Sequence, residues 1–373
     1  MKSKTLQFNS TDSFSLGVEI EFQILAKSNF ALSPRGPILQ ASAPAQLQPR
    51  IAPEFITSIL EIQTGVCPSV RAVENDLLQT CTLMEELADE HECILFAASL
   101  HPFARAAEQQ TSQEERYQRI MEELQLIGRR FITQGLHIHV GLADGDTAVR
   151  VNNLLQAYLP LFLALSCSSP FFEGEDTGLL SYRTKLFESL PMAGIYPYVE
   201  NWRAYSEEIH NLIHHGIIES PRDLWWDCRP NYRFGTVEIR ICDLPCRFSD
   251  ILALVALIQS TVAWLGEEVK EARPLRLLLL SANKWQAVRH GSRGRFVDPL
   301  GLLGTENMSV AEAIRRLRDR TERFCHQLGG DSYLDPLDTI ITRGTGAELM
   351  RRSFAETNDF VQVIGTLHKG FWQ

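Results

Sequence analysis

Apolar and polar residues alternate in four separate stretches of the chain, and this pattern predicts β-strands at residues 14–25, 59–66, 135–142 and 234–243. Successive side chains of a strand point to opposite faces, so each stretch would bury one face and leave the other polar. The apolar face of the first stretch would carry Phe14, Leu16, Val18, Ile20, Phe22 and Ile24. The other three stretches follow the same rule.

The polar faces of these predicted strands are rich in side chains that bind metal ions or anions. They carry Glu19, Glu21, Gln23, Glu61, His137, His139, Glu238 and Arg240. If the four strands share one sheet, these side chains lie together on one surface. Crowded carboxylates repel one another and raise one another's pKa unless cations lie between them. The pattern therefore predicts a metal site on one face of a sheet.

The rest of the chain supplies helices and loops around these strands. Apolar residues at helical spacing predict helices at residues 70–92, 112–133 (with Ser112 as N-cap), 147–166, 251–270, 315–328 and 347–367. A short strand is expected at 94–99, and loops at 31–53 and 174–205. Strands and helices do not alternate as in a parallel sheet. We therefore expect an α+β fold, with helices packed on one face of an antiparallel sheet and an open, ligand-binding face on the other.

The span of the polar residues bears on domain organisation. They run from Glu19 to Arg240, so one shared site would involve most of the chain. A split into two domains inside that range is not expected. We predict a single catalytic domain, residues 1–373.

Composition and charge narrow the classes of partner and the cellular location. The chain has 373 residues, is 45% hydrophobic and carries a net charge of −10, which disfavours nucleic acid as a partner. The first residues lack the apolar core of a signal peptide, and the longest apolar run, 251–265, is too short to span a membrane. The eight cysteines show no CxxC pair, which favours reduced thiols. We expect a cytoplasmic protein that binds neither nucleic acid nor membrane.

Each motif taken alone has a simpler explanation as a polar surface pair or a packing residue. This holds also for Arg183, Arg229 and Arg289, and the pair Trp225 and Trp226 is expected in the core. The joint occurrence of the motifs on four correctly phased strands favours one shared site. Four glutamates against two histidines point to Mg²⁺ or Mn²⁺ rather than zinc.

Hard cations beside an arginine suggest phosphate chemistry, because metal and guanidinium both neutralise developing negative charge. The sequence contains no GxxxxGK[ST] loop and no GxGxxG after a predicted strand. Any nucleotide would therefore be held by metal ions and arginines.

Several stretches, read together, resemble the bacterial carboxylate–amine ligases of the glutamate–cysteine ligase type 2 family. The matching stretches include LGVEIEF, LEIQTGVC, HPFAR with ERYQRI downstream, GLHIHVGL, WWDCRP, FGTVEIRICD and NKWQAVRHG. They occur in the family's order and cover residues 14–295. The set is also similar to glutamine synthetase, in which comparable strands surround ATP and metal ions.

The resemblance implies a glutamine-synthetase-like fold and ATP-dependent amide formation with Mg²⁺ or Mn²⁺. The positions that match metal ligands are Glu19, Glu21, Glu61, His137 and Glu238, with Glu54 as a further candidate. The ATP-binding positions are His139, Arg240 and Arg289, and the catalytic arginines are Arg240 and Arg183. The implied substrates are a glutamate-like amino acid and an amine such as cysteine, and the implied assembly is a homodimer.

Two other functions are compatible with some of these motifs. A metal-dependent amide hydrolase could be built on the His137-x-His139 strand, with the metal generating hydroxide. The excess of carboxylates and the lack of further histidine ligands argue against it. A relative that has lost catalysis is disfavoured because the acidic and basic residues are all present.

Overall fold

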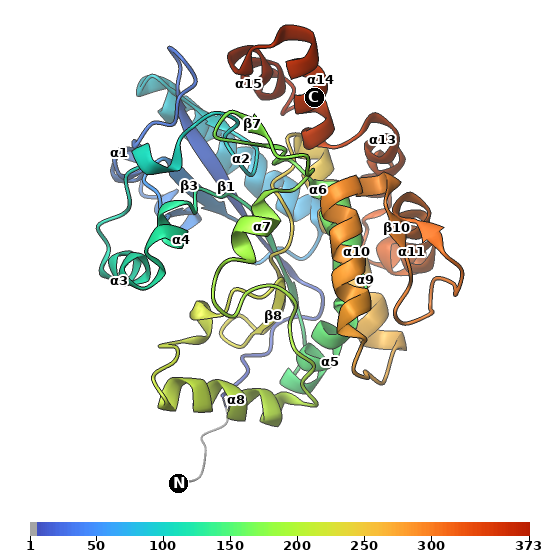
Figure 1. Ribbon diagram of the computed structural model, residues 1–373. Helices are drawn as coiled ribbons and strands as arrows, with labels where there is room; N and C mark the ends of the chain where they lie inside the picture. The colour runs from blue at the N-terminus through green and yellow to red at the C-terminus, as the bar shows by residue number, and fades with distance from the viewer. Residues whose placement is uncertain (1–5) are drawn as a thin grey trace.

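A seven-stranded antiparallel sheet lies at the centre of the protein (Figure 1). The structure is a computed structural model that describes residues 6–373. Its strands are β1 Leu16–Ala26, β2 Ile51–Pro53, β3 Ile59–Gln63, β4 Cys93–Phe96, β5 Leu136–Gly141, β8 Cys228–Asn231 and β9 Thr236–Ile239. The order across the sheet is β2-β3-β1-β5-β9-β8, and β4 also pairs with β1. The four strands predicted to carry the polar residues are therefore neighbours.

The register of these four strands brings their polar residues into one band across the sheet. Glu21 of β1 pairs with Glu61 of β3, and Glu19 pairs with His137 of β5. His139 in turn pairs with Glu238 of β9. Because the side chains of directly paired residues lie on the same face, the predicted site forms one continuous surface.

The opposite, apolar face of the sheet is covered by four helices. They are α2 Val70–Glu90, α5 Gly145–Leu155, α6 Leu159–Ser166 and α9 Phe248–Glu268. The core joins Val18 and Ile20 of β1 and Ile138 of β5 to these helices. Helix α9 is the one helix among residues 6–373 that is apolar and long enough to cross a membrane, but 94% of its most apolar window is buried. It is a core helix, as the sequence predicted.

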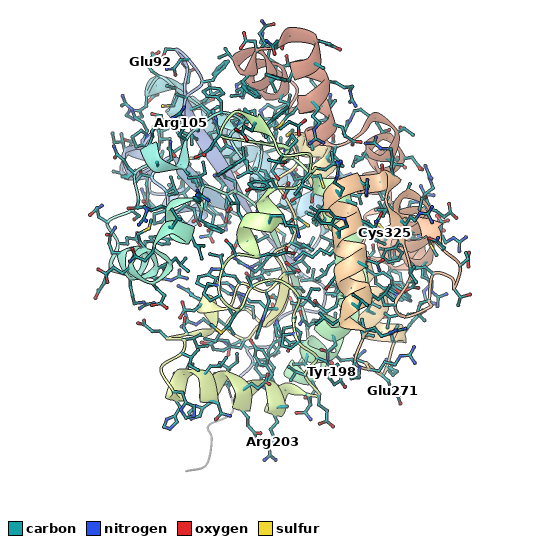
Figure 2. The ribbon with its side chains drawn as sticks, in the orientation of Figure 1. Glu92, Arg105, Tyr198, Arg203, Glu271 and Cys325 are labelled. Carbon is teal, nitrogen blue, oxygen red and sulfur yellow. The ribbon has the colours of Figure 1, made fainter. Side chains whose placement is uncertain are left out.

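Further helices and two small hairpins surround this centre. The helices are α1 Gly36–Ser42, α3 Glu115–Leu124, α4 Leu126–Arg129, α7 Arg183–Phe187, α8 Trp202–His214, α10 Leu277–His290, α11 Val310–Gln327, α12 Asp331–Leu334, α13 Pro336–Arg343, α14 Gly346–Thr357 and α15 Phe360–Lys369. The hairpins pair β6 Phe171–Phe172 with β7 Glu175–Asp176, and β10 Arg295–Phe296 with β11 Met308–Ser309. All eight cysteines are buried and free, among them Cys325 of α11 (Figure 2).

Several predicted helices are shorter or divided, and the backbone explains each difference. The helix expected at 112–133 begins at Glu115, with Glu114 rather than Ser112 as N-cap, and ends where Gln125 adopts a φ of 50°. The helix expected at 147–166 is two helices, α5 and α6, because Pro160 at the start of α6 has no N–H to continue a helix. The helix expected at 347–367 breaks at Asn358, which adopts a left-handed conformation.

The two segments predicted as loops contain regular structure. Residues 31–53 form helix α1 and the edge strand β2, and residues 174–205 contain β7, α7 and the start of α8. These elements are short, so their periodic pattern is too brief to be distinguished in the sequence.

Candidate active site

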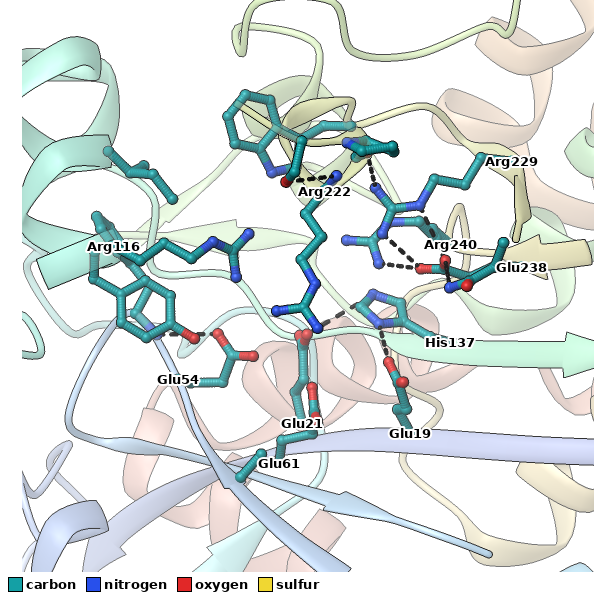
Figure 3. Close-up of a pocket in the computed structure, with 18 of the residues that line it drawn as sticks. Glu19, Glu21, Glu54, Glu61, Arg116, His137, Arg222, Arg229, Glu238 and Arg240 are labelled. Atoms are coloured by element: carbon teal, nitrogen blue, oxygen red, sulfur yellow. Dashed lines mark hydrogen bonds and ion pairs between the residues drawn. The ribbon is translucent and has the colours of Figure 1, made fainter. Parts of the chain in front are cut away.

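A cavity of about 480 Å³ lies on the polar face of the sheet (Figure 3). Its floor carries Glu19, Glu21, Glu61, His137, His139 and Glu238. One wall comes from α3 and another from residues 220–234, which include strand β8. The face predicted to be open is therefore the floor of a pocket that is partly open to solvent, in which electrostatic forces are stronger than in bulk water.

Three carboxylates cluster at one end of this floor. Ligand oxygens of Glu21, Glu54 and Glu61 all lie within 4.8 Å of one another. Burial, together with the charge of Glu54, raises the pKa of Glu21 to about 8. Burial and the neighbouring carboxylates also hold the pKa of Glu61 well above its usual range. In the absence of cations, such a cluster retains protons at neutral pH.

Glu19 lies between the two histidines of β5. His137 Nδ1 is 3.1 Å from Glu19 Oε2, and His139 Nε2 is 3.3 Å from Glu19 Oε1. Burial disfavours the charged carboxylate, but hydrogen bonds from both imidazoles outweigh it and lower the pKa of Glu19. Burial and the nearby Arg240 lower the pKa of His137 to about 4, so its imidazole is neutral at neutral pH.

The donor set of the floor fits a divalent cation. His137 donates through Nδ1 to Glu19, which leaves its buried Nε2 without a hydrogen-bond partner among residues 6–373. That nitrogen faces Glu21 Oε1 across 3.8 Å. Two ligand atoms that share a cation at about 2.1 Å each can be up to about 4.2 Å apart, so the gap accommodates an ion. Glu21, Glu54, Glu61, Glu19 and His137 could hold Mg²⁺ or Mn²⁺.

Glu238 is engaged differently from this carboxylate cluster. It accepts hydrogen bonds from Arg229 Nε at 3.0 Å, Arg229 Nη2 at 3.1 Å, Asn231 Nδ2 at 3.0 Å and Arg240 Nη1 at 2.5 Å. Burial opposes its ionisation, but the two guanidinium groups hold the pKa of Glu238 well below its usual range. These four donors surround the carboxylate, so here Glu238 anchors arginines and lies outside the group of Glu21, Glu54 and Glu61; its role as a metal ligand stays a prediction.

Arg183 does not line the cavity, and its role in catalysis stays a prediction. Its side chain is buried, and its guanidinium donates to the carbonyls of Arg240 at 3.3 Å and Ile241 at 3.4 Å. The ring of Phe187 covers it at 4.3 Å. A Cβ on Gly135 would come within 2.3 Å of Arg183 Nη2, so this close packing requires glycine. Arg183 supports the backbone of Arg240.

Arg289 and the tryptophan pair also differ from expectation. Arg289 is exposed at the end of α10, outside the cavity lining, and donates to the carbonyl of Gly178. Its contact with ATP stays a prediction. Trp226 is buried in a core cluster, as expected, whereas Trp225 lines the cavity.

Arg116 of α3, Arg222 and Arg233 line the cavity although no sequence motif assigned them a role, and Figure 3 shows the first two. Arg116 belongs to the ERYQRI stretch, the only signal that could have drawn attention to it. Arg222 lies in SPRDLWW, where a lone arginine in a polar loop resembles any surface arginine. Their position depends on contacts between segments far apart in the sequence.

Comparisons with known proteins agree on the family. Residues 15–362 match the family described as Glutamate-cysteine ligase family 2 (GCS2). A protein of Gloeobacter violaceus named "Putative glutamate--cysteine ligase 2" is 38% identical over 371 residues, covering 98% of this chain and 99% of that protein. A protein of the same name from Solibacter usitatus is 32% identical and covers 94% of this chain and 92% of its own.

Solved structures share the fold at low sequence identity. Glutamate–cysteine ligase from Francisella tularensis, in complex with AMP, has a TM-score of 0.70 at 12% identity, covering 97% of this chain and 90% of its own. A bifunctional glutathione synthetase from Pasteurella multocida has a TM-score of 0.70 at 13% identity, covering 96% of this chain and 52% of its own. The expected antiparallel sheet with helices on one face is confirmed. The chain belongs to glutamate–cysteine ligase family 2.

Proposed function

We propose that this enzyme is an ATP-dependent carboxylate–amine ligase that joins a glutamate-like amino acid to an amine such as that of cysteine. Family membership supports a ligase that forms a C–N bond. The observation that carries the proposal is the convergence of a cation-binding carboxylate cluster and a held arginine, Arg240, in one cavity. We further expect a homodimer or larger assembly, as the family resemblance implies, and a cytoplasmic location, as the free cysteines favour.

The reaction would proceed in two steps. A carboxylate oxygen of the glutamate-like substrate attacks the γ-phosphorus of ATP, the bond from that phosphorus to ADP breaks, and an acyl phosphate forms. The amine nitrogen then attacks the acyl carbon, inorganic phosphate leaves, and the nitrogen loses a proton. Little covalent chemistry is asked of the protein, so positioning and charge stabilisation account for catalysis.

The residues of the cavity have separate roles in this scheme. Glu19, Glu21, Glu54, Glu61 and His137 would hold Mg²⁺ or Mn²⁺, which when bound neutralises phosphate charge. Arg240 would stabilise negative charge at the transferring phosphoryl group. Its Nη1 is fixed by Glu238, while its buried Nε has no hydrogen-bond partner among residues 6–373. His139 stays a predicted neighbour of the phosphates.

The hydrolase alternative is not favoured by this geometry. Both imidazoles of the His137-x-His139 strand contact Glu19. Among residues 6–373, the one group of three side chains close enough together to bind a common metal ion consists of Glu21, Glu54 and Glu61. A zinc hydrolase would instead place nitrogen ligands around an open position.

An ADP-release screen tests the proposed function. Amino acids and amines would be supplied in pairs, with Mg²⁺ and Mn²⁺ in parallel reactions. We expect release of ADP and phosphate that requires ATP, a divalent cation and both substrates. Release of AMP and pyrophosphate, or amide hydrolysis without ATP, would show that the proposal is wrong.

A further inference from the structure

Arg222 reaches into the cavity from the segment of residues 216–224, which we name the Arg222 loop. Figure 3 shows its side chain directed into the pocket, above the carboxylates of the sheet. Its side chain makes no ion pair or hydrogen bond with any of residues 6–373; only its backbone N–H is bonded, to Ser220 Oγ at 3.3 Å. By contrast, Arg229 and Arg240 both pair with Glu238. Arg222 is exposed at the mouth of the cavity, so its guanidinium contacts solvent and its hydrogen-bonding capacity is free for a ligand.

The Arg222 loop is held by its own short-range hydrogen bonds. Asp223 Oδ2 accepts from the backbone N–H groups of Glu219 at 2.9 Å and Ser220 at 3.0 Å. Together with the Ser220 hydroxyl these contacts form a capping box around the helical turn Pro221–Asp223. The backbone that carries Arg222 is thus fixed rather than free to fold away.

A second set of contacts connects this loop to the sheet. Arg229 Nη1 donates to the carbonyls of Pro221 at 3.2 Å and Leu224 at 2.7 Å, on either side of Arg222. The remaining nitrogens of the same guanidinium hold Glu238 of β9. Arg229 is almost fully buried, and five donors in a rigid plane allow it to serve both partners at once. The position of Arg222 is therefore fixed by Arg229, which is itself held by Glu238 on the floor of the cavity.

The charges of the cavity define the class of ligand. A divalent cation would neutralise the carboxylate cluster, and the two arginines on Glu238 are already paired. The planar fork of Arg222 would then face the cavity as a free donor for an oxyanion, which a guanidinium binds bidentately. ATP and the glutamate-like substrate of the proposed reaction both carry such groups, as phosphates or carboxylates.

We propose that Arg222 binds a phosphate of ATP or a carboxylate of the glutamate-like substrate, and that Arg229 is the positioning residue that holds it over the site. The proposal rests on the proposed function for the identity of the substrates. It concerns residues to which neither the strand motifs nor the expected metal site assigns a role.

The test compares Arg222→Gln with the wild-type protein. Calorimetry would measure the binding of MgATP and of L-glutamate separately, and steady-state kinetics would give KM and kcat for each. We expect the dissociation constant and KM of one of the two to rise about 10- to 100-fold, as for loss of a charge-assisted hydrogen bond, and the other to change less than about twofold. An effect on MgATP identifies a phosphate as the ligand, and an effect on glutamate identifies a carboxylate. No effect on either overturns the proposal.

A matched control removes the same charge elsewhere. Arg203 projects from α8 into solvent, with its side chain 82% exposed and paired only with Glu207 (Figure 2). Arg203→Gln should leave both dissociation constants unchanged. Because binding is measured without turnover, the role of Arg222 is decided even if no substrate pair releases ADP, and that failure would concern the proposed function alone.

The positioning role has its own variant. Asp223→Ala loosens the Arg222 loop without removing any side chain that lines the cavity. It should raise the dissociation constant of the same substrate as Arg222→Gln does, but by a smaller factor. In the double variant with Arg222→Gln, it should cause no further rise. Arg229→Lys should raise the same constant, and it should also lower kcat because lysine cannot hold Glu238, which anchors Arg240, through two nitrogens. Independent, additive effects, or an equal loss for both substrates, would contradict positioning.

Discussion

At the scale of single residues, the partners of a side chain decide its role more than its place in a motif does. Glu21 and Glu238 both lie on the polar face of the sheet, yet burial and like charges raise the pKa of Glu21, whereas Arg229 and Arg240 lower that of Glu238. Alternation in the sequence predicts which face each occupies. It does not distinguish a residue suited to bind a cation from one that anchors arginines, because Arg229 reaches Glu238 from another strand.

Glu238→Gln should therefore damage both stability and activity. The amide leaves two buried guanidinium groups without a carboxylate, and breaking a buried pair costs about 3–5 kcal/mol. Urea unfolding should show that loss, and ADP release should fall by more than about tenfold because Arg240 loses its anchor. Glu306→Gln breaks an exposed ion pair with Arg316 and should change neither. Unaltered stability in the Glu238 variant would contradict the buried pairing.

Arg240→Lys should act mainly on the chemical step. Lysine keeps the charge but loses the planar fork, and charge at the transferring phosphoryl group is largest in the transition state. We expect kcat to fall on the order of 10²-fold, with a smaller change in the KM for ATP. Steady-state kinetics separates the two parameters. A rise in KM at constant kcat would instead mean that Arg240 only binds ground-state ATP.

At the scale of elements, the four strands of the site could be predicted, whereas its walls could not. In each strand, apolar and polar residues alternate over several repeats, which is a clear signal. The register then pairs Glu21 with Glu61, so that both lie on the same polar face. The helix predicted at 112–133 is longer than the observed helix, because Gln125 adopts a positive φ. Glutamine gives no sequence signal for that conformation. The Arg222 loop carries no periodic signal, since long-range bonds from Arg229 fix it.

Helix α10 makes an element-scale connection that can be tested. Its Lys284 is buried and contacts Asp227 Oδ2 at 2.6 Å and Glu188 Oε1 at 3.0 Å, joining α10 to the segment before β8 and to the end of α7. The backbone carbonyl of Asp227 in turn accepts a hydrogen bond from the backbone N–H of Arg240 at 2.9 Å. Lys284→Met should lower the free energy of unfolding by about 3–5 kcal/mol, because Asp227 is left buried and unpaired.

Denaturant unfolding would measure this loss, and the double variant Lys284→Met with Asp227→Asn should recover part of it because no unpaired charge remains. ADP release should fall in the single variant through displacement of Arg240. A double variant that is less stable than Lys284→Met alone would refute the pairing.

At the scale of the whole molecule, the carboxylate cluster should make stability depend on pH and on cations. The pKa of Glu21 is about 8 in the folded protein, against an ordinary 4.5, and those of Glu54 and Glu61 are also raised. Between these values the folded state binds more protons than the unfolded state, so stability falls as pH rises. The lowered pKa of His137 acts in the opposite sense, but only below its ordinary 6.5.

Without divalent cations, Tm should therefore decrease from pH 6.5 to 8, with a loss of about 1.4 kcal/mol per pH unit for each extra proton held. Mg²⁺ or Mn²⁺ should raise Tm more at pH 8 than at pH 6.5, because the ionised cluster binds cations better. Thermal unfolding at pH 6.5 and pH 8, with a chelator and with added Mg²⁺ or Mn²⁺, would measure these changes in Tm. Glu21→Gln should flatten the pH dependence; a slope that is unchanged in this variant would exclude the cluster as its source.

The order of strands in the sheet also has a consequence for how the protein is made. Strand β1, synthesised early, lies inside the sheet between β3 and β5, and β5 pairs with β9, which ends at Ile239. The apolar face of these strands is completed only by α9, which ends at Glu268. A growing chain therefore exposes an unpaired strand edge and an apolar surface until most of it has left the ribosome. Such long-range pairing folds slowly and is open to aggregation, so we expect chaperones that protect the nascent chain to raise the yield of folded protein.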